Sequence, residues 1–201
     1  MRGPLTLEDV EERANLAISI DPEVHRDAAA DFQVWASESH PDDDTEVTRG
    51  QLLVFAGEQL AMAGDREAAL GLLREAVASG DATFPDARAY LVHALLDCGL
   101  TDEADKVAET LRRERHTDPR VHERVGQAYR HAKRPDVALR WFTMGLVRAV
   151  RDRDLLVAPI LMIERYEIRQ AMGFPPDDYD ALAQEALELA DEETDDELGD
   201  N

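Results

Sequence analysis

The side chains best suited to chemistry in this sequence are arginines gathered in one segment. Residues 112–153 contain twelve basic residues and only five acidic ones, whereas the whole chain carries a formal net charge of −22. Guanidinium groups bind carboxylates and phosphates through paired hydrogen bonds, so this segment predicts an anion-binding surface that includes Arg120, Arg124 and Arg130. The alternative is that most of these arginines face solvent and pair with acidic residues one helical turn away.

No arrangement of residues in the sequence predicts catalysis or a metal centre. The six histidines include no HExxH-like pair, and His40, beside the aspartates at 42–44, lacks the ligand spacing of a calcium loop. His93 and Cys98 are five residues apart, on different faces of a helix, so Cys98 is expected to be a small packing residue. Phosphate-binding glycine loops and nucleophile elbows do not occur. We therefore expect a protein that is not an enzyme and has no cofactor.

The helices that carry these arginines can be predicted from short segments that recur at an interval of 34 or 35 residues. The segment GDREAAL at 64–70 returns as GLTDEA at 99–104 and as KRPDVAL at 133–139. The small residue in the middle of each copy is Ala69, Ala104 or Ala138. A period near 34, with a turn followed by an acidic residue at a helix start, predicts a solenoid of helical hairpins.

Apolar periodicity and helix-end signals predict ten helices, so the expected fold class is all-α. The helices are expected near 6–18, 22–36, 47–63, 65–79, 84–98, 101–114, 118–132, 135–150, 154–172 and 177–192. Thr6 can cap the first helix and Asp21 the second, while Gly173 and the prolines after it stop the ninth. Beyond residue 191 the chain is almost purely acidic, which predicts disorder.

The three copies resemble tetratricopeptide repeats. That pattern places a large residue, Leu-Gly and Tyr on the first helix of a hairpin, and Ala followed by an aromatic residue on the second. Matching residues occur in all three copies: Leu53, Gly57, Leu60, Ala69, Leu73 and Ala76 in the first, Leu91, Leu95 and Ala104 in the second, and Val125, Gly126, Tyr129, Ala138 and Phe142 in the third. The small residues are expected where two helix backbones approach closely.

The resemblance implies a TPR-like solenoid divided into four segments. Residues 1–49 would form N-terminal capping helices with an acidic loop, and 50–152 would form the three repeats. Residues 153–190 would be C-terminal capping helices, which cover the exposed end of a solenoid, and 191–201 an acidic disordered tail.

The resemblance also implies which residues contact a partner. In tetratricopeptide repeat proteins the first helices line a concave groove, where partners usually bind. Transferring those positions to this sequence by repeat register predicts a groove whose lining changes from apolar and acidic residues to basic residues. Its candidate ligand residues are Phe55, Met62, Tyr90, His93, Arg120, Arg124, Gln127 and Arg130.

Two of these residues match a known clamp for C-terminal carboxylates of chaperones. Arg120 and Arg124 coincide with its basic positions in the third repeat. Val54, Glu58 and Tyr90 replace its other residues, so we expect a different acidic or C-terminal peptide instead of a chaperone tail.

Composition limits where the protein acts and what it binds. The single cysteine excludes an internal disulfide framework and fits a reducing, cytoplasmic location. The first residues lack the apolar segment of a signal peptide, and no apolar run reaches the roughly 20 residues of a membrane span. The net charge of −22 opposes binding to nucleic acid and to anionic membranes.

These observations predict a module that binds a protein or peptide segment with one apolar and one acidic end. The apolar candidates of the groove would hold the first end, and its arginines the second. One alternative is a homodimer formed through Trp35 or through the face from Leu155 to Ile163; another is RNA binding through the basic segment, which the net charge opposes. The tail at 191–201 could cover the arginines as a mimic of an acidic ligand, or it could only aid solubility.

Overall fold

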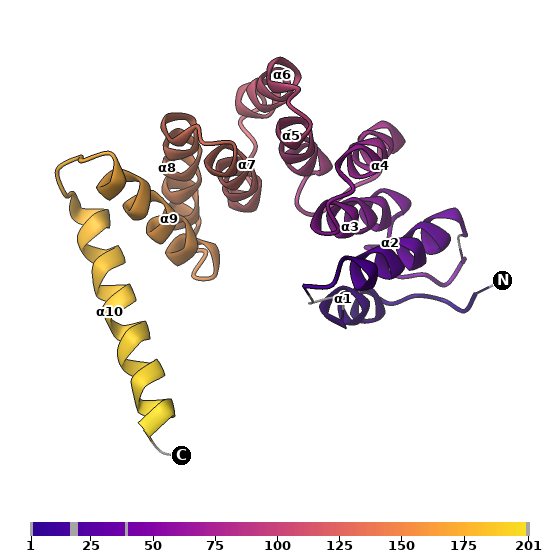
Figure 1. The fold of residues 1–201 in the computed structure, drawn as a ribbon, viewed down its shortest axis with the longest axis horizontal. Helices are drawn as coiled ribbons and strands as arrows, with labels where there is room; N and C mark the ends of the chain where they lie inside the picture. Colours follow the sequence, from indigo (N-terminus) through magenta and orange to yellow (C-terminus); the bar gives the residue numbers. More distant parts are fainter. Residues whose placement is uncertain (1, 17–19, 39, 200–201) are drawn as a thin grey trace. The chain divides into compact units, whose positions relative to one another are not determined.

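The computed structural model describes residues 2–16, 20–38 and 40–199, and the regular elements within these ranges are all α-helices. In chain order the helices are α1 (Leu7–Leu16), α2 (Pro22–Ser37), α3 (Arg49–Met62), α4 (Arg66–Ser79), α5 (Ala87–Asp97), α6 (Thr101–Arg113), α7 (Pro119–His131), α8 (Pro135–Asp152), α9 (Val157–Ala171) and α10 (Asp178–Gly199) (Figure 1). The all-α fold of helical hairpins is therefore confirmed. None of these helices combines the length and apolar character that a membrane span needs.

The chain forms two compact units, with α1–α6 in unit 1 (Met1–Arg115) and α7–α10 in unit 2 (His116–Asn201). The boundary between them falls within the block 50–152 that was predicted to hold all three repeats. It follows Arg115, which adopts a left-handed backbone conformation with φ 53° after the end of α6. The third repeat thus belongs to a different unit from the first two, a division that the even spacing of the repeats does not reveal.

In unit 1, the successive helices from α2 to α6 pack side by side. α2 contacts α3, α3 contacts α4, α4 contacts α5, and α5 contacts α6. α3 also contacts α5, so the first helices of the first two repeats are neighbours. The interior contains fully buried side chains from most of these helices: Val10, Phe32, Val54, Val92, Leu95 and Leu111.

Unit 2 repeats this arrangement with four helices. α7 packs on α8, α8 on α9 and α9 on α10, and α7 also contacts α9. Its fully buried side chains are Val121, Val125, Tyr129, Phe142, Leu146 and Leu161.

A cluster of ion pairs fastens the start of α10 to α9. The Arg165 side chain is only 8% exposed; its Nη1 lies 2.8 Å from Oδ1 of Asp180, and its Nη2 pairs with Asp177. Arg169 reaches the other oxygen of Asp180 with Nε at 2.8 Å. The hydrogen bond from Arg165 holds the pKa of the Asp177 carboxyl at about 2, below its ordinary value. This cluster compensates charges that would otherwise be costly to bury.

Glycines at equivalent positions allow the two best-matched hairpins to close. A Cβ added to Gly57 on α3 would lie 2.8 Å from Cγ of Leu73 on α4. A Cβ added to Gly126 on α7 would lie only 2.4 Å from the Phe142 ring on α8. The small residues of the repeat therefore lie where side chains of the second helix press against the first, as the repeat pattern predicts.

Helix ends follow the expected capping chemistry at most positions. Thr6 Oγ1 accepts a hydrogen bond from Asp9 N at 3.1 Å, and Asp9 Oδ2 accepts one from Thr6 N at 2.8 Å. Asp21 caps α2 by accepting from Glu23 N at 3.0 Å, and Gly173 ends α9 with φ 71°. The predicted end of the first helix, at 18, lies outside the described residues.

The acidic C-terminal segment differs from its prediction. The last helix was expected to end near 192, whereas α10 continues to Gly199. Glu, Ala and Leu make up thirteen of the eighteen residues at 181–198, and their high helix propensity favours a helix in this segment despite its negative charge.

Candidate functional site

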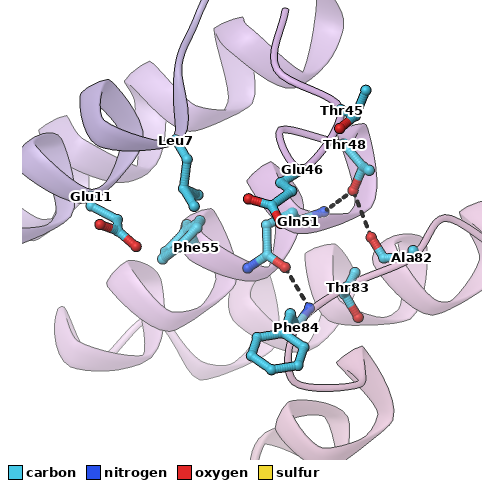
Figure 2. Close-up of a pocket in the computed structure, with 10 residues that line it drawn as sticks. All are labelled: Leu7, Glu11, Thr45, Glu46, Thr48, Gln51, Phe55, Ala82, Thr83 and Phe84. Atoms are coloured by element: carbon cyan, nitrogen blue, oxygen red, sulfur yellow. Dashed lines mark hydrogen bonds between the residues drawn. The ribbon is translucent and has the colours of Figure 1, made fainter.

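A pocket of about 510 Å³ lies in unit 1, at the start of α3 (Figure 2). α1 contributes Leu7 and Glu11 to its lining, and α3 contributes Gln51 and Phe55. The remaining lining residues come from the connections before α3 and α5: Thr45, Glu46, Thr48, Ala82, Thr83 and Phe84. The volume is within the range of ligand-binding clefts, and the lining combines apolar rings with a few polar groups.

Hydrogen bonds hold the segment before α5 against the beginning of α3. Thr48, the N-cap of α3, accepts from Gln51 N at 3.0 Å and donates to the Ala82 carbonyl at 2.9 Å. Gln51 Oε1 accepts from Phe84 N at 2.7 Å. Gly50 N donates to Asp81 Oδ2 at 2.9 Å. Two walls of the pocket are therefore fixed relative to each other before any ligand binds.

Aromatic residues give the pocket its apolar surface. Phe55 is half-buried and stacks on Phe32, with ring centroids 5.4 Å apart and an interplanar angle of 28°. Phe32 is fully buried and also packs against Trp35 in a T-shaped arrangement. Phe84 is 63% exposed, which is unusual for so large an apolar side chain. The Phe55 ring is thus packed against Phe32, while most of the Phe84 side chain is exposed to solvent.

The structure separates the candidate residues of unit 1. Phe55 lines the pocket, whereas Met62, Tyr90 and His93 do not. Met62 is 60% exposed at the end of α3, and Tyr90 is buried, which leaves little of its ring for a partner. His93 is half-buried, with Nε2 3.7 Å from Oδ2 of Asp97.

In unit 2, the candidate arginines have acidic neighbours. Arg130 pairs with Glu164 and, at 2.6 Å, with Glu167, both on α9. Arg120 Nη1 lies 3.8 Å from Oδ1 of Asp118. The interpretation of the basic segment considered only acids within 112–153, so it missed the two glutamates that α9 brings to Arg130.

The other two candidates of unit 2 lie on α7 close to a half-buried acid. Arg124 and Gln127 are both half-buried, and Gln127 Nε2 donates to Glu123 Oε1 at 3.1 Å. Burial raises the pKa of the Glu123 carboxyl above its ordinary value, while the charge of Arg124 opposes that shift. Arg124 is therefore placed to balance the charge of a local acid.

Cys98 has the surroundings expected of a packing residue. It is half-buried at the end of α5, and burial raises the pKa of its thiol above the ordinary value. A raised pKa keeps the sulfur protonated near neutral pH, which disfavours its use as a nucleophile.

Sequence reasoning missed the pocket residues that lie outside α3, among them Glu11, Glu46 and Phe84. They belong to α1 and to two connections, outside the repeat register from which groove positions were transferred. A signal was present in the Thr-x-x-Gln segment at 48–51, which follows Glu46 and precedes an apolar helix. Such a segment marks a helix start, and connections next to helix starts often carry binding residues.

A match to a known family covers part of the chain. Residues 60–128 match the tetratricopeptide repeat. No curated protein and no solved structure matched the chain.

Proposed function

We propose that this chain, a TPR-like repeat protein, is a non-catalytic module that binds a segment of another protein in the pocket at the start of α3. Tetratricopeptide repeats generally mediate protein–protein interaction. The observation that carries the proposal is the pocket itself, an open cavity of about 510 Å³ lined by two phenylalanines, Phe55 and Phe84.

The construction of the pocket supports a binding role. Its walls are joined by the hydrogen bonds of Thr48 and Gln51, so little conformational freedom needs to be lost when a ligand enters. Aromatic side chains beside fixed polar groups are also the usual composition of a protein-binding hot spot. The lone Cys98 fits a reducing compartment, and the proposal places the module in the cytoplasm.

Unit 2 supplies a second contact in the proposal. Arg120 and Arg124, with Gln127 beside them on α7, would bind an acidic part of the partner, as the repeat register predicts. Arg130 contributes less to binding of the acidic part, because its ion pairs with Glu164 and Glu167 already offset its charge.

Site-specific cross-linking tests the proposed pocket. A photoreactive residue replaces Thr45, an exposed pocket residue, in the full-length chain expressed in its native cells. We expect a defined partner to be captured from position 45, and capture to fall at least about fivefold when Phe84→Ala removes the exposed ring. The matched control places the photoreactive group at Lys106, which is exposed on α6. Equal capture from both positions, or capture indifferent to Phe84→Ala, would contradict the proposal.

A second candidate function is self-association through unit 2. Where α8 ends and α9 begins, five apolar side chains are exposed: Val147 (54%), Val150 (42%), Leu155 (83%), Leu156 (76%) and Ile160 (43%). Large exposed apolar patches often mark interfaces. Sedimentation velocity should then show a dimer that Leu155→Ser with Leu156→Ser converts to a monomer, while Leu182→Ser on α10 has no effect. A monomeric wild-type chain would exclude this candidate.

A further inference from the structure

We propose that the pocket of unit 1 selects an arginine or lysine side chain carried by an extended peptide segment of the partner. The inference rests on the proposed function and deepens it, because it names the part of the partner that this pocket recognises. Three features of the pocket lead to this ligand: a buried amide donor, two carboxylates and an aromatic surface.

The amide donor belongs to Gln51, which is only 6% exposed. The backbone N–H of Phe84 can only donate, so the Gln51 atom that faces it at 2.7 Å must be Oε1. Nε2 then faces the pocket, and no described residue accepts a hydrogen bond from it (Figure 2). Nε2 is therefore available to donate a hydrogen bond to a ligand, and a peptide carbonyl oxygen is a suitable acceptor.

The two carboxylates belong to Glu11 and Glu46, and no described side chain pairs with either of them. The four basic residues among the first 60 all form ion pairs elsewhere: Arg2 with Asp43, Arg13 with Asp31, Arg26 with Asp65 and Arg49 with Glu75. Residues 1–115 as a whole contain 25 acidic and 11 basic side chains. A cation is therefore attracted to this pocket, and an acidic peptide is repelled from it.

The aromatic surface selects the shape of the cation. Arginine and lysine combine an apolar stem with a charged head, and guanidinium and ammonium groups also interact favourably with aromatic faces. The stem would lie on Phe55 and Phe84, with the head at Glu11 and Glu46. A purely apolar side chain would leave both carboxylates without a counter-charge. A free polyamine would bring the charge but no carbonyl for Gln51, so the full set of groups favours a residue within a peptide.

Matched peptides test this specificity on the full-length protein. Four short acetylated and amidated peptides share serine and leucine flanks and carry Arg, Lys, citrulline or Glu at the centre, and spermidine is a fifth probe. Affinities come from calorimetry, and the site from nitrogen-15 shifts of the Gln51 side-chain amide and the Phe84 N–H. We expect the Arg and Lys peptides to bind at least about tenfold more tightly than the citrulline and Glu peptides and spermidine, with shifts at both amides.

Charge-neutral variants identify the groups responsible. Glu11→Gln combined with Glu46→Gln should weaken binding of the Arg peptide about tenfold and leave the affinity of the citrulline peptide unchanged. The matched control, Glu8→Gln with Glu12→Gln, removes two charges from exposed positions on the same helix α1, outside the pocket. It should alter the affinity of the Arg peptide by less than about twofold.

The outcomes separate this inference from the proposed function. If citrulline and arginine peptides bind equally at the pocket, the charge selection is wrong while a protein-binding pocket stands. Spermidine that binds as tightly as the Arg peptide, with the same loss in the double variant, would overturn the peptide part of the inference. If none of the peptides shifts Gln51 or Phe84 and cross-linking from position 45 also captures nothing, the proposed function itself fails.

Discussion

Unit 1 and unit 2 use their charged residues in opposite ways. Unit 2 contains most of the arginine-rich segment, yet Arg130 there is matched by Glu164 and Glu167 from a helix further along the chain. Unit 1 is strongly acidic and its N-terminal arginines are all paired, whereas no described side chain pairs with Glu11 or Glu46 at its pocket. The charge that a surface offers a ligand therefore depends on pairing in the fold more than on the local density of charges in the sequence.

The largest effect we expect comes from the buried ion pairs of unit 2. Arg165→Ala should lower the free energy of unfolding by about 3–5 kcal/mol. The substitution removes one of the two cations that pair with the carboxylate of Asp180, whose side chain is only 5% exposed. The corresponding change in unit 1, Arg26→Ala, removes a solvated pair with Asp65 and should have a much smaller effect. Urea unfolding followed by circular dichroism compares the two variants, and equal losses would contradict the distinction.

The stability of unit 2 should fall in mild acid because of His122. This residue is buried, with its ring 5.4 Å from Trp141, and burial lowers its pKa from 6.5 to about 4. The unfolded chain accepts a proton below about 6.5 and the folded chain does not, so stability is complete above that pH and declines by about 3 kcal/mol toward pH 4.

Each unit contains one tryptophan, which makes the pH effect measurable unit by unit. Trp35→Phe leaves Trp141 as the fluorescent reporter of unit 2 during urea unfolding at several pH values. Nuclear magnetic resonance of the His122 ring provides the direct check. A ring that titrates near 6.5 in the folded protein would contradict the prediction.

The two close-contact glycines should differ in their tolerance of a methyl group. Gly126→Ala forces a methyl group against the rigid Phe142 ring. It should lower the free energy of unfolding by about 2 kcal/mol, even after the gain in helix propensity. Gly57→Ala meets Leu73, whose branched end can rotate away, and should cost about 1 kcal/mol or less. Fluorescence of Trp141 and Trp35 follows the respective units. A larger loss for Gly57→Ala would reverse this comparison.

The smallest predicted effect concerns the arginines of unit 2. Glu164→Gln with Glu167→Gln would release Arg130 and should strengthen binding of an acidic peptide by about threefold to fivefold at low salt. Calorimetry with a glutamate-rich peptide measures this gain. The control, Asp178→Asn with Glu185→Gln, removes the same charge from exposed positions of α10. An equal gain in the control would show that only net charge matters.

Most of the fold could be predicted from the sequence because its signals are local. Capping residues such as Thr6 and Asp21, and turn residues such as Gly173, act within a few positions of themselves. The division after Arg115 could not be predicted, since it depends on contacts between helices rather than on the repeat period. The length of α10 was missed because the prediction ended the helix where the run of acidic residues begins.

The candidate site was less predictable because its residues come from separate segments. Phe55 was identified from the repeat register, but Glu11 lies on a helix outside the register, and Phe84 lies in a connection. Their convergence requires knowledge of how α1 and the connection before α5 are placed at α3. The pairing of Arg130 was missed for the same reason, since its partners are 34 and 37 residues away.

Gln51 also links occupancy of the pocket to the start of α5. Its amide can accept from Phe84 N–H and donate to a ligand at the same time, and hydrogen bonds in such a chain polarise and strengthen one another. Phe84 lies two residues before Asp86, whose carboxylate caps α5 by accepting from Arg88 N at 2.9 Å. A bound peptide carbonyl would therefore slow hydrogen exchange at the Phe84 amide, so that Gln51 acts as a relay between ligand and backbone.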